Sequence, residues 1–230
     1  MNNIIANIKK PYIIGAVILL VVIGGFFIYE HEYSPEAKYK KGLRYYKDGD
    51  YKKAAHLFKE AAKQGYAPAE EKLGYMYGRG RGVSQNRYEA VHWFEKAAKQ
   101  GNAKGEFYLG MMYLAGSEGS HPSKKGMYWL KKSAEQGDAE AEDFLGMIYL
   151  GDSGAPHDYK KAAYWFKKAA HQGDALGEYF LSRMYQYGKG VPQDNKKASY
   201  WIKKAKEQKY TKGEYYIDEL RKLKDLLGGY

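Results

Sequence analysis

The sequence predicts an all-α protein, an α-solenoid of helix-turn-helix repeats that follows an N-terminal transmembrane helix. Three observations lead to this prediction. A motif returns every 36 residues and is marked by Trp93, Trp129, Trp165 and Trp201. Within each unit the apolar residues have helical spacing. An uncharged apolar run lies near the amino terminus.

The first predicted element is a membrane span over residues 11–29, after a short tail of residues 1–10. The run carries no charge, and a helix of this length extends roughly 28 Å, close to the thickness of a hydrocarbon core. The alternative is a cleaved signal peptide, which has a shorter apolar core and a small-residue cleavage site. Because the run ends in Phe-Phe-Ile-Tyr, we favour an uncleaved anchor.

Basic residues on the two sides of the span give opposing signals for its orientation. Lys9 and Lys10 before the span favour a cytoplasmic amino terminus, whereas Lys38, Lys40 and Arg44 after it favour the reverse. Because a long domain is translocated largely regardless of its charge, we expect the first orientation. For a bacterial chain, this predicts a single-pass inner-membrane protein with its repeat domain in the periplasm.

After a linker of residues 30–34, the chain is a series of similar units. The first unit is shorter, because Gly42 and Tyr45 stand only 32 residues before Gly74 and Tyr77. The same 36-residue step links Gly65, Gly101, Gly137 and Gly173, as well as Leu73, Leu109, Leu145 and Leu181. We expect five repeats over residues 35–209, at about 35–65, 66–101, 102–137, 138–173 and 174–209, and a capping helix over residues 210–230.

Each unit is expected to contain two helices joined by a turn. In the third unit, Ala103, Leu109 and Tyr113 mark the first helix, and Gly126 and Trp129 mark the second. A glycine ends one helix and an Asn or Asp caps the next at the joints Gly101-Asn102, Gly137-Asp138 and Gly173-Asp174. Because one unit has too little apolar area to fold alone, stacking stabilises the array.

The motif resembles a known repeat. It reads Ala-x-x-x-Leu-Gly-x-x-Tyr, then Gly-x-Gly-Val, then Lys-Ala-x-x-Trp-x-x-Lys-Ala-Ala, and is similar to the Sel-one-like repeat of the tetratricopeptide-like superfamily. The last full unit matches at Leu181, Tyr185, Gly188, Gly190, Val191, Lys197, Ala198, Trp201, Lys204 and Ala205. The resemblance implies a right-handed solenoid whose first helices line a concave groove, and a role as an adaptor surface. The third and fourth units depart from the motif in the loop, at Ser117-Glu118 and Asp152-Ser153.

Composition excludes several classes of protein. The chain has 230 residues, 25 Tyr, no Cys and a net charge of +11. Without cysteine, disulfide scaffolds, thiolate zinc sites and iron–sulfur clusters are excluded. The β-lactam activity of the cysteine-rich branch of the similar family is therefore not expected. The aromatic content is too high for a disordered basic tail.

Short segments that look catalytic have structural explanations. Gly78-Arg79-Gly80-Arg81-Gly82 looks like a phosphate loop, but its glycines recur as Gly188 and Gly190 in an interhelical turn. Gly151-Asp152-Ser153-Gly154 lies in another such turn, with no histidine partner evident in the sequence. The six histidines lack metal-binding spacing. We therefore expect no enzyme, no catalytic residue, no metal and no cofactor.

Function is expected in the groove, on the first helices. The residues at the groove positions differ from unit to unit and include Tyr, Met, Phe and Arg. These residue types are enriched where proteins bind proteins. About half of the candidates are expected to be exposed, and the others to pack against the adjacent helix. The candidate protein-binding residues are Tyr39, Tyr46, Glu71, Tyr75, Arg79, Phe107, Met111, Asp143, Met147, Tyr179, Arg183 and Tyr187.

Lysine pairs recur with the repeat, as at Lys160-Lys161 and Lys196-Lys197. This periodicity favours a solvated convex face. The alternative is contact with anionic lipid or with an acidic partner. Nucleic acid is not expected as a partner, because the predicted topology places the domain outside the cytoplasm.

The sequence therefore favours a membrane-tethered protein–protein interaction module. The partner is an envelope protein or a toxic effector, so that the chain is an envelope adaptor or regulator, or an immunity protein. The alternative is an enzyme acting on cell-envelope material, peptidoglycan or a β-lactam-like ligand, for which Glu71, Asp143 and Arg183 would have to converge. Oligomerisation through the solenoid ends is a third hypothesis, which the polar residues of the last helix oppose.

Overall fold

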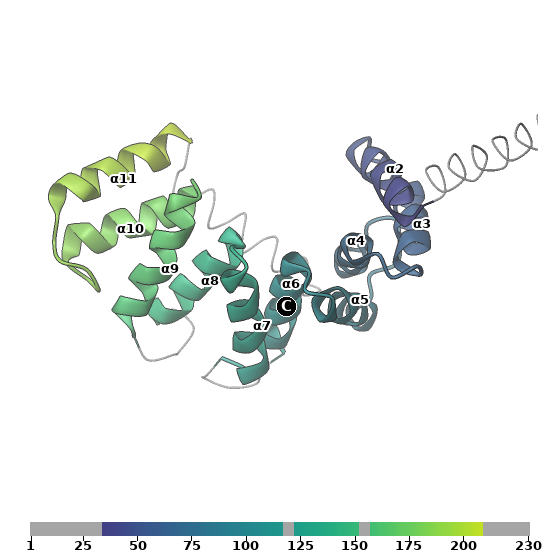
Figure 1. The fold of residues 1–230 in the computed structure, drawn as a ribbon, viewed down its shortest axis with the longest axis horizontal. Coiled ribbons are helices and arrows are strands. Elements are labelled where there is room, and N and C mark those ends of the chain that lie inside the picture. The colour runs from purple at the N-terminus through teal and green to yellow at the C-terminus, as the bar shows by residue number, and fades with distance from the viewer. Residues whose placement is uncertain (1–33, 117–121, 152–156, 209–230) are drawn as a thin grey trace, which may run out of the picture.

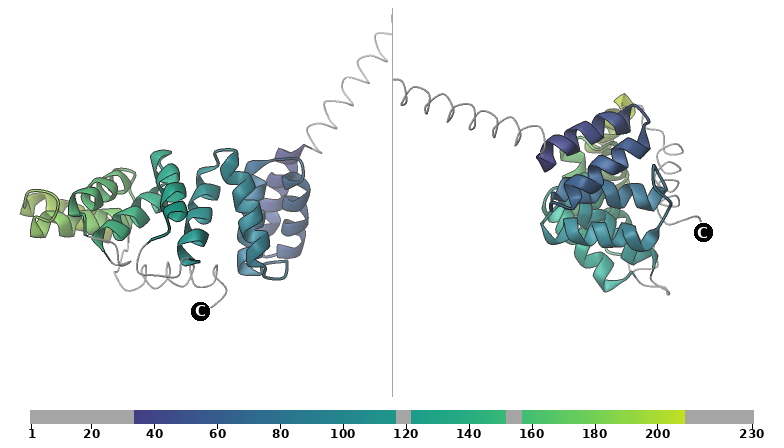
Figure 2. Two further views of the ribbon diagram at one scale, coloured as in Figure 1. Left: turned by 90° about the horizontal axis from the view of Figure 1, so that it is seen from below. Right: turned by 90° about the vertical axis from the view of Figure 1, so that its right-hand side faces the viewer.

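The computed structural model describes residues 34–116, 122–151 and 157–208, and these form ten α-helices and no strand. Consecutive helices pack against each other, and the array forms an arc (Figure 1, Figure 2). The predicted all-helical solenoid is confirmed. The helices are α2 (Pro35–Lys47), α3 (Tyr51–Ala62), α4 (Ala67–Arg79), α5 (Arg87–Lys99), α6 (Ala103–Ala115), α7 (Lys124–Glu135), α8 (Ala139–Leu150), α9 (Tyr159–His171), α10 (Ala175–Tyr187) and α11 (Asn195–Glu207).

The joints between units have the predicted caps. Asn102 accepts a hydrogen bond from the Gly105 amide at 2.7 Å, and Asp138 accepts one from the Ala141 amide at 3.0 Å. These bonds satisfy N–H groups that the first turn of a helix leaves without a partner. The preceding glycine has a φ of +78° at Gly101, a left-handed conformation that other residues rarely adopt. The short joints keep successive units in contact.

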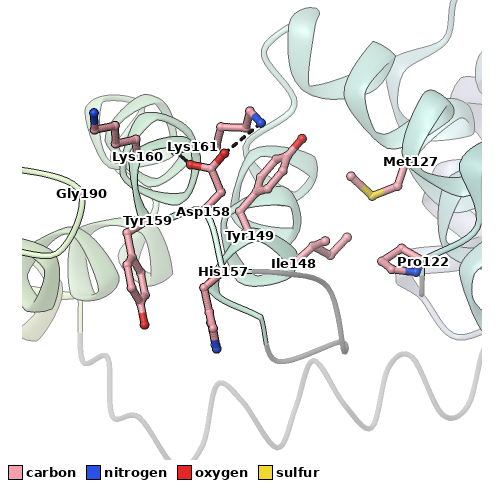
Figure 3. A pocket seen from close by; sticks show the side chains of 10 residues that line it. All are labelled: Pro122, Met127, Ile148, Tyr149, His157, Asp158, Tyr159, Lys160, Lys161 and Gly190. Carbon is pink, nitrogen blue, oxygen red and sulfur yellow. Dashed lines mark hydrogen bonds and ion pairs between the residues drawn. The ribbon is translucent and has the colours of Figure 1, made fainter. Parts of the chain in front are cut away.

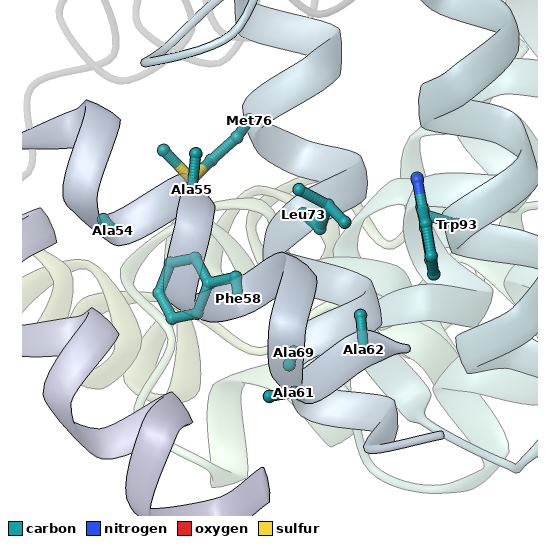
Figure 4. Packing of buried hydrophobic residues seen from close by; sticks show 9 residues of the cluster. All are labelled: Ala54, Ala55, Phe58, Ala61, Ala62, Ala69, Leu73, Met76 and Trp93. Atoms are coloured by element: carbon teal, nitrogen blue, oxygen red, sulfur yellow. The ribbon is translucent and has the colours of Figure 1, made fainter. Parts of the chain in front are cut away.

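One large side chain and one glycine interlock the two helices of each of the first four units. The side chains are Phe58, Phe94, Leu130 and Phe166, which face Gly42, Gly74, Gly110 and Gly146. A Cβ atom at Gly42 would lie 2.7 Å from the Phe58 ring. Figure 4 shows Phe58 among the small side chains of α3 and α4. The missing Cβ atoms therefore set how closely the paired helices approach.

Buried glutamates tie each first helix to the second helix of its own unit, from the second unit onward. Glu106 is fully buried and accepts a hydrogen bond from Gln136 at 2.6 Å, and Lys132 pairs with it at 2.9 Å. The same donor–acceptor pair recurs as Gln100–Glu70, Gln172–Glu142 and Gln208–Glu178. Because buried polar groups need partners, this bond restricts the packing of the pair to one register.

The structure corrects the predicted location in the inner membrane. Among the described residues, no helix has the length and apolar character to cross a membrane. The helices have 12 or 13 residues, roughly 20 Å in length, and each carries charged residues, whereas a hydrocarbon core is about 30 Å thick. This finding overturns the assignment as a single-pass inner-membrane protein with a periplasmic repeat domain. The predicted tail of residues 1–10, the span of residues 11–29 and the capping helix of residues 210–230 lie outside the described residues.

Candidate functional site

The first helices of the units form the inner layer of the arc. Figure 1 shows α4, α6 and α8 on its inner side and α5 and α7 on its outer side. The helices α4 and α6 also pack directly against each other. Such contact is expected where neighbouring units of a curved array are closest. We call the surface of α2, α4, α6, α8 and α10 on this side the concave face, and the surface of the second helices the convex face.

The structure divides the twelve predicted groove residues into three groups. Glu71, Phe107, Met111 and Asp143 are buried. Arg183 and Tyr187 are exposed. The half-buried residues are Tyr39, Tyr46, Tyr75, Arg79, Met147 and Tyr179. The four buried side chains are covered by the solenoid itself, so the other eight are the ones a partner can contact.

Aromatic rings and basic side chains alternate at the α2–α4 end of the concave face. The Tyr75 ring lies 5.6 Å from the Tyr108 ring, and the Arg79 guanidinium lies 5.2 Å from the Tyr75 centroid. Such cation–π contacts hold the two side chains in place at a modest gain in free energy, about 0.5–1 kcal/mol at exposed sites. This end of the concave face therefore carries ordered, half-exposed tyrosines beside positive charge.

Arg81 belongs to the same end, although it lies in the turn between α4 and α5. Its Nη1 donates a hydrogen bond to the Tyr46 hydroxyl at 2.6 Å. Its guanidinium also lies 5.9 Å from the Tyr46 ring centroid and 5.4 Å from that of Tyr51. The sequence interpretation missed this residue, because the glycines around it indicated only a turn. The available signal was the pair of arginines, since the corresponding residues of the last unit are Tyr187 and Lys189.

A mixed network of charges occupies the middle of the concave face. Lys104 of α6 contacts the carboxylates of Asp138 and Glu140, each at 3.0 Å, and so links two units. Glu71 is buried beside Lys72, 3.3 Å away, and its Oε1 accepts no hydrogen bond from the described residues. Burial raises the pKa of Glu71. Burial also raises the pKa of Tyr108, so that its hydroxyl stays protonated.

Asp143 occupies the position in α8 that corresponds to Glu71 in α4. It is 2% exposed, and burial raises its pKa well above the usual range, with a further contribution from Asp174. A Cβ atom built on Gly177 would lie 2.9 Å from Asp143 Oδ1, so the carboxyl packs against the first turn of α10. Asp143 therefore belongs to the joint between the last two units and is not available to a partner.

The α10 end of the concave face carries exposed groups. The Arg183 guanidinium lies 4.7 Å from the Tyr187 ring centroid and donates a hydrogen bond to Gln186 at 3.2 Å. The Tyr187 side chain is 53% exposed, whereas Tyr179 packs edge-on against Phe180. Both ends of the concave face thus present an arginine stacked on a tyrosine.

The structure does not bring together the residues that an envelope enzyme would need. Glu71 contacts Lys72, Asp143 faces Asp174, and Arg183 contacts Gln186, so the three have different neighbours. Among the described residues, no three His, Asp or Glu side chains are arranged to hold a metal ion.

A cavity of about 710 Å³ lies between the ends of α7, α8 and α9 (Figure 3). In the second and last units, Val83 and Val191 of the Gly-x-Gly-Val turn pack onto the core. The corresponding residues of the third and fourth units, Gly119 and Ala155, lie outside the described residues. The lining residues are Pro122, Met127, Ile148, Tyr149, His157, Asp158, Tyr159, Lys160, Lys161 and Gly190.

The stacked helix pairs and the exposed inner face define an α-solenoid repeat protein of the tetratricopeptide-like class. The Sel1 repeat model matches residues 35–66, 67–102, 103–138, 139–174 and 175–210. The chain belongs to the Sel1 repeat family, which confirms the resemblance seen in the sequence. Proteins of this family are scaffolds for protein interactions.

Solved structures of bacterial repeat proteins have a similar fold. A Sel1 repeat protein from Oxalobacter formigenes is 31% identical with a TM-score of 0.70, and the match covers 77% of this chain and 74% of that one. A protective antigen of uropathogenic Escherichia coli with an SLR fold is 31% identical with a TM-score of 0.68, over 85% of this chain but only 42% of that one. A Sel1 repeat protein from Klebsiella pneumoniae is 25% identical with a TM-score of 0.54, over 81% of this chain and 93% of that one. No curated protein matches the sequence.

Proposed function

We propose that this chain is a protein-interaction scaffold that holds a protein partner on its concave face. The observation that carries the proposal is the group of tyrosines left half-buried or exposed on the first helices. They are Tyr39, Tyr46, Tyr75, Tyr179 and Tyr187. Tyrosine and arginine are enriched among the residues that dominate binding free energy at protein interfaces. The proposal includes no membrane attachment.

Two versions of this role differ in the affinity and number of partners. An immunity protein binds one toxic effector tightly, as a one-to-one complex. An adaptor or regulator binds several partners with dissociation constants of about 1 μM, which corresponds to roughly 8 kcal/mol of binding free energy. Titration calorimetry with each captured protein distinguishes the two versions.

The test compares a concave-face variant with a matched convex-face variant. The concave variant carries Tyr75→Ala, Tyr179→Ala and Tyr187→Ala. The control carries the same change at three convex-face residues, Tyr128, Tyr164 and Tyr200, whose exposed fractions are 58%, 56% and 52%. Each full-length chain is immobilised and incubated with lysate of the source cells. Bound proteins are then identified by mass spectrometry.

We expect a partner that binds the wild type and the convex variant but not the concave variant. Circular dichroism must show the same helix content and melting temperature for all three proteins, since Tyr75 also packs against Tyr108. A partner that is lost only from the convex variant, or retained by both variants, would overturn the assignment to the concave face.

A further inference from the structure

Arg81 is a positive charge held in a fixed orientation. A hydrogen bond to the hydroxyl of Tyr46 and contacts with the rings of Tyr46 and Tyr51 hold its guanidinium. These contacts use one of its five N–H donors, and no carboxylate of the described residues pairs with it. The side chain is only half-buried, so the other donors can be reached from solvent.

The corresponding residue of the last unit shows which of these contacts belong to the repeat itself. Lys189 occupies the same place in its turn, and its Nζ lies 5.0 Å from the Tyr159 ring centroid. A cation over this tyrosine is therefore a recurring feature. The position of Tyr46 is occupied in the fourth unit by Leu150, which has no hydroxyl. Of these two turn cations, only Arg81 therefore has a tyrosine hydroxyl to orient it.

Neighbouring residues add positive charge and hydrogen-bonding groups to this end. Arg79 lies over the Tyr75 ring at 5.2 Å. Tyr46 and Tyr75 carry hydroxyl groups that can donate to an anion. A planar guanidinium binds a carboxylate through two parallel hydrogen bonds, and an ordered one loses little conformational entropy on binding.

We propose that Arg81, together with Arg79, Tyr46 and Tyr75, forms an anion-binding site that takes an Asp or Glu side chain from an acidic segment of the protein partner. The inference rests on the proposed function and specifies the chemistry of the partner. Charge complementarity supports it, because the chain has a net charge of +11 and attracts acidic segments at long range.

The test measures binding of two short fluorescein-labelled peptides by fluorescence anisotropy at physiological ionic strength. One peptide alternates Glu and Ala, and the other has Gln in place of each Glu. The proteins are the full-length wild type, Arg81→Met and Lys189→Met. Both substitutions remove one positive charge from the same position of a turn, so they weaken general electrostatic attraction equally.

We expect the wild type to bind the Glu peptide at least about tenfold more tightly than the Gln peptide, as a charge-assisted hydrogen-bond pair provides. Arg81→Met should lose about tenfold in affinity for the Glu peptide, and Lys189→Met less than about twofold. If Arg81→Met loses helix content by circular dichroism, Tyr46→Phe replaces it, because that change removes the hydroxyl that orients Arg81 and that can itself donate to the anion.

Three outcomes would overturn the proposal. The first is equal weakening by Arg81→Met and Lys189→Met, which would indicate nonspecific attraction. The second is no binding of the Glu peptide by the wild type. The third is that the wild type binds both peptides equally and that the concave variant (Tyr75→Ala, Tyr179→Ala and Tyr187→Ala) binds neither. This last result would exclude the anion-binding site but would still be consistent with the proposed scaffold function.

Discussion

The carboxyl group of Asp143 is buried against Asp174, the residue that caps α10. Neither oxygen of Asp143 receives a hydrogen bond from the described residues. Asp174 itself accepts from the amides of Leu176 at 2.8 Å and Gly177 at 3.2 Å, so its carboxylate is fixed in place. Burial and this neighbouring carboxylate both favour the protonated form of Asp143 and raise its pKa well above 3.8. The last joint of the solenoid therefore contains a buried carboxyl group whose pKa is raised.

Replacing Asp143 with Asn should stabilise the protein at neutral pH. The folded state holds the Asp143 proton more tightly than the unfolded state. Its contribution to stability is therefore fully present below the usual pKa of 3.8 and is lost as the pH rises through the raised folded value. An Asn amide donates to Asp174 at every pH. We expect Asp143→Asn to gain about 1–3 kcal/mol in free energy of unfolding at pH 8, the cost of a buried group without a partner.

Urea denaturation at pH 4 and pH 8 checks this expectation. The gain should shrink at pH 4, where the wild-type carboxyl is protonated. Asp158→Asn is the control, because Asp158 is paired with Lys161 at 2.8 Å, and hydrogen bonds from Lys161 lower its pKa. That control should destabilise the protein at pH 8. An equal gain by Asp143→Asn at both pH values would contradict a protonation effect.

Because Lys132 pairs with the buried Glu106, it should contribute more to the free energy of unfolding than its neighbour Lys131. Lys132 lies 2.9 Å from a carboxylate that is fully buried, whereas Lys131 pairs at 3.7 Å with the exposed Glu135. Lys132→Met should cost about 1–2 kcal/mol in free energy of unfolding, because it leaves a buried charge with one partner fewer. Lys131→Met should cost less than about 0.5 kcal/mol.

A double-mutant cycle tests this explanation. Glu106→Gln removes the buried charge and keeps a side chain of the same shape beside Gln136. If the cost of Lys132→Met arises from an uncompensated charge, it should largely disappear in the Glu106→Gln background. Denaturant titration of the four proteins at pH 7 gives the coupling free energy. A cost of Lys132→Met that is unchanged in that background would show that lost packing against Trp129 is responsible instead.

The repeat pattern was sufficient to predict the helices because each constraint lies within one unit or one joint. The glycines, the capping Asn and Asp residues and the periodic apolar positions act on residues near them in the chain. The buried Glu–Gln pairs also recur every 36 residues, as the glutamates Glu70, Glu106 and Glu142 show, and the same self-alignment could have found them.

The candidate site was harder to predict because exposure depends on how neighbouring units are rotated. Phe107 and Met111 are buried because they pack in one cluster with residues of α8, including Phe144, 6.3 Å from Phe107 between ring centroids. Arg81 is oriented by Tyr46, 35 residues earlier, and no local pattern specifies that contact. The predicted location in the inner membrane was wrong for another reason: it depended on residues 1–33, and none of the described helices is long and apolar enough to cross a membrane.

Gly74 provides a test of the close approach between α4 and α5. A Cβ atom there would lie 2.8 Å from Phe94 Cδ1 and 3.1 Å from the Ala90 carbonyl oxygen. Gly74→Ala gains about 0.5–1 kcal/mol from helix propensity, but the clash in a packed core should cost more, about 1–3 kcal/mol. We expect a net loss of free energy of unfolding in urea titrations. Phe94→Leu, which moves the ring atoms out of the way, should reduce the cost of Gly74→Ala by about half or more. Strictly additive costs in the double variant would show that the backbone of α5, and not the Phe94 ring, sets the distance between the two helices.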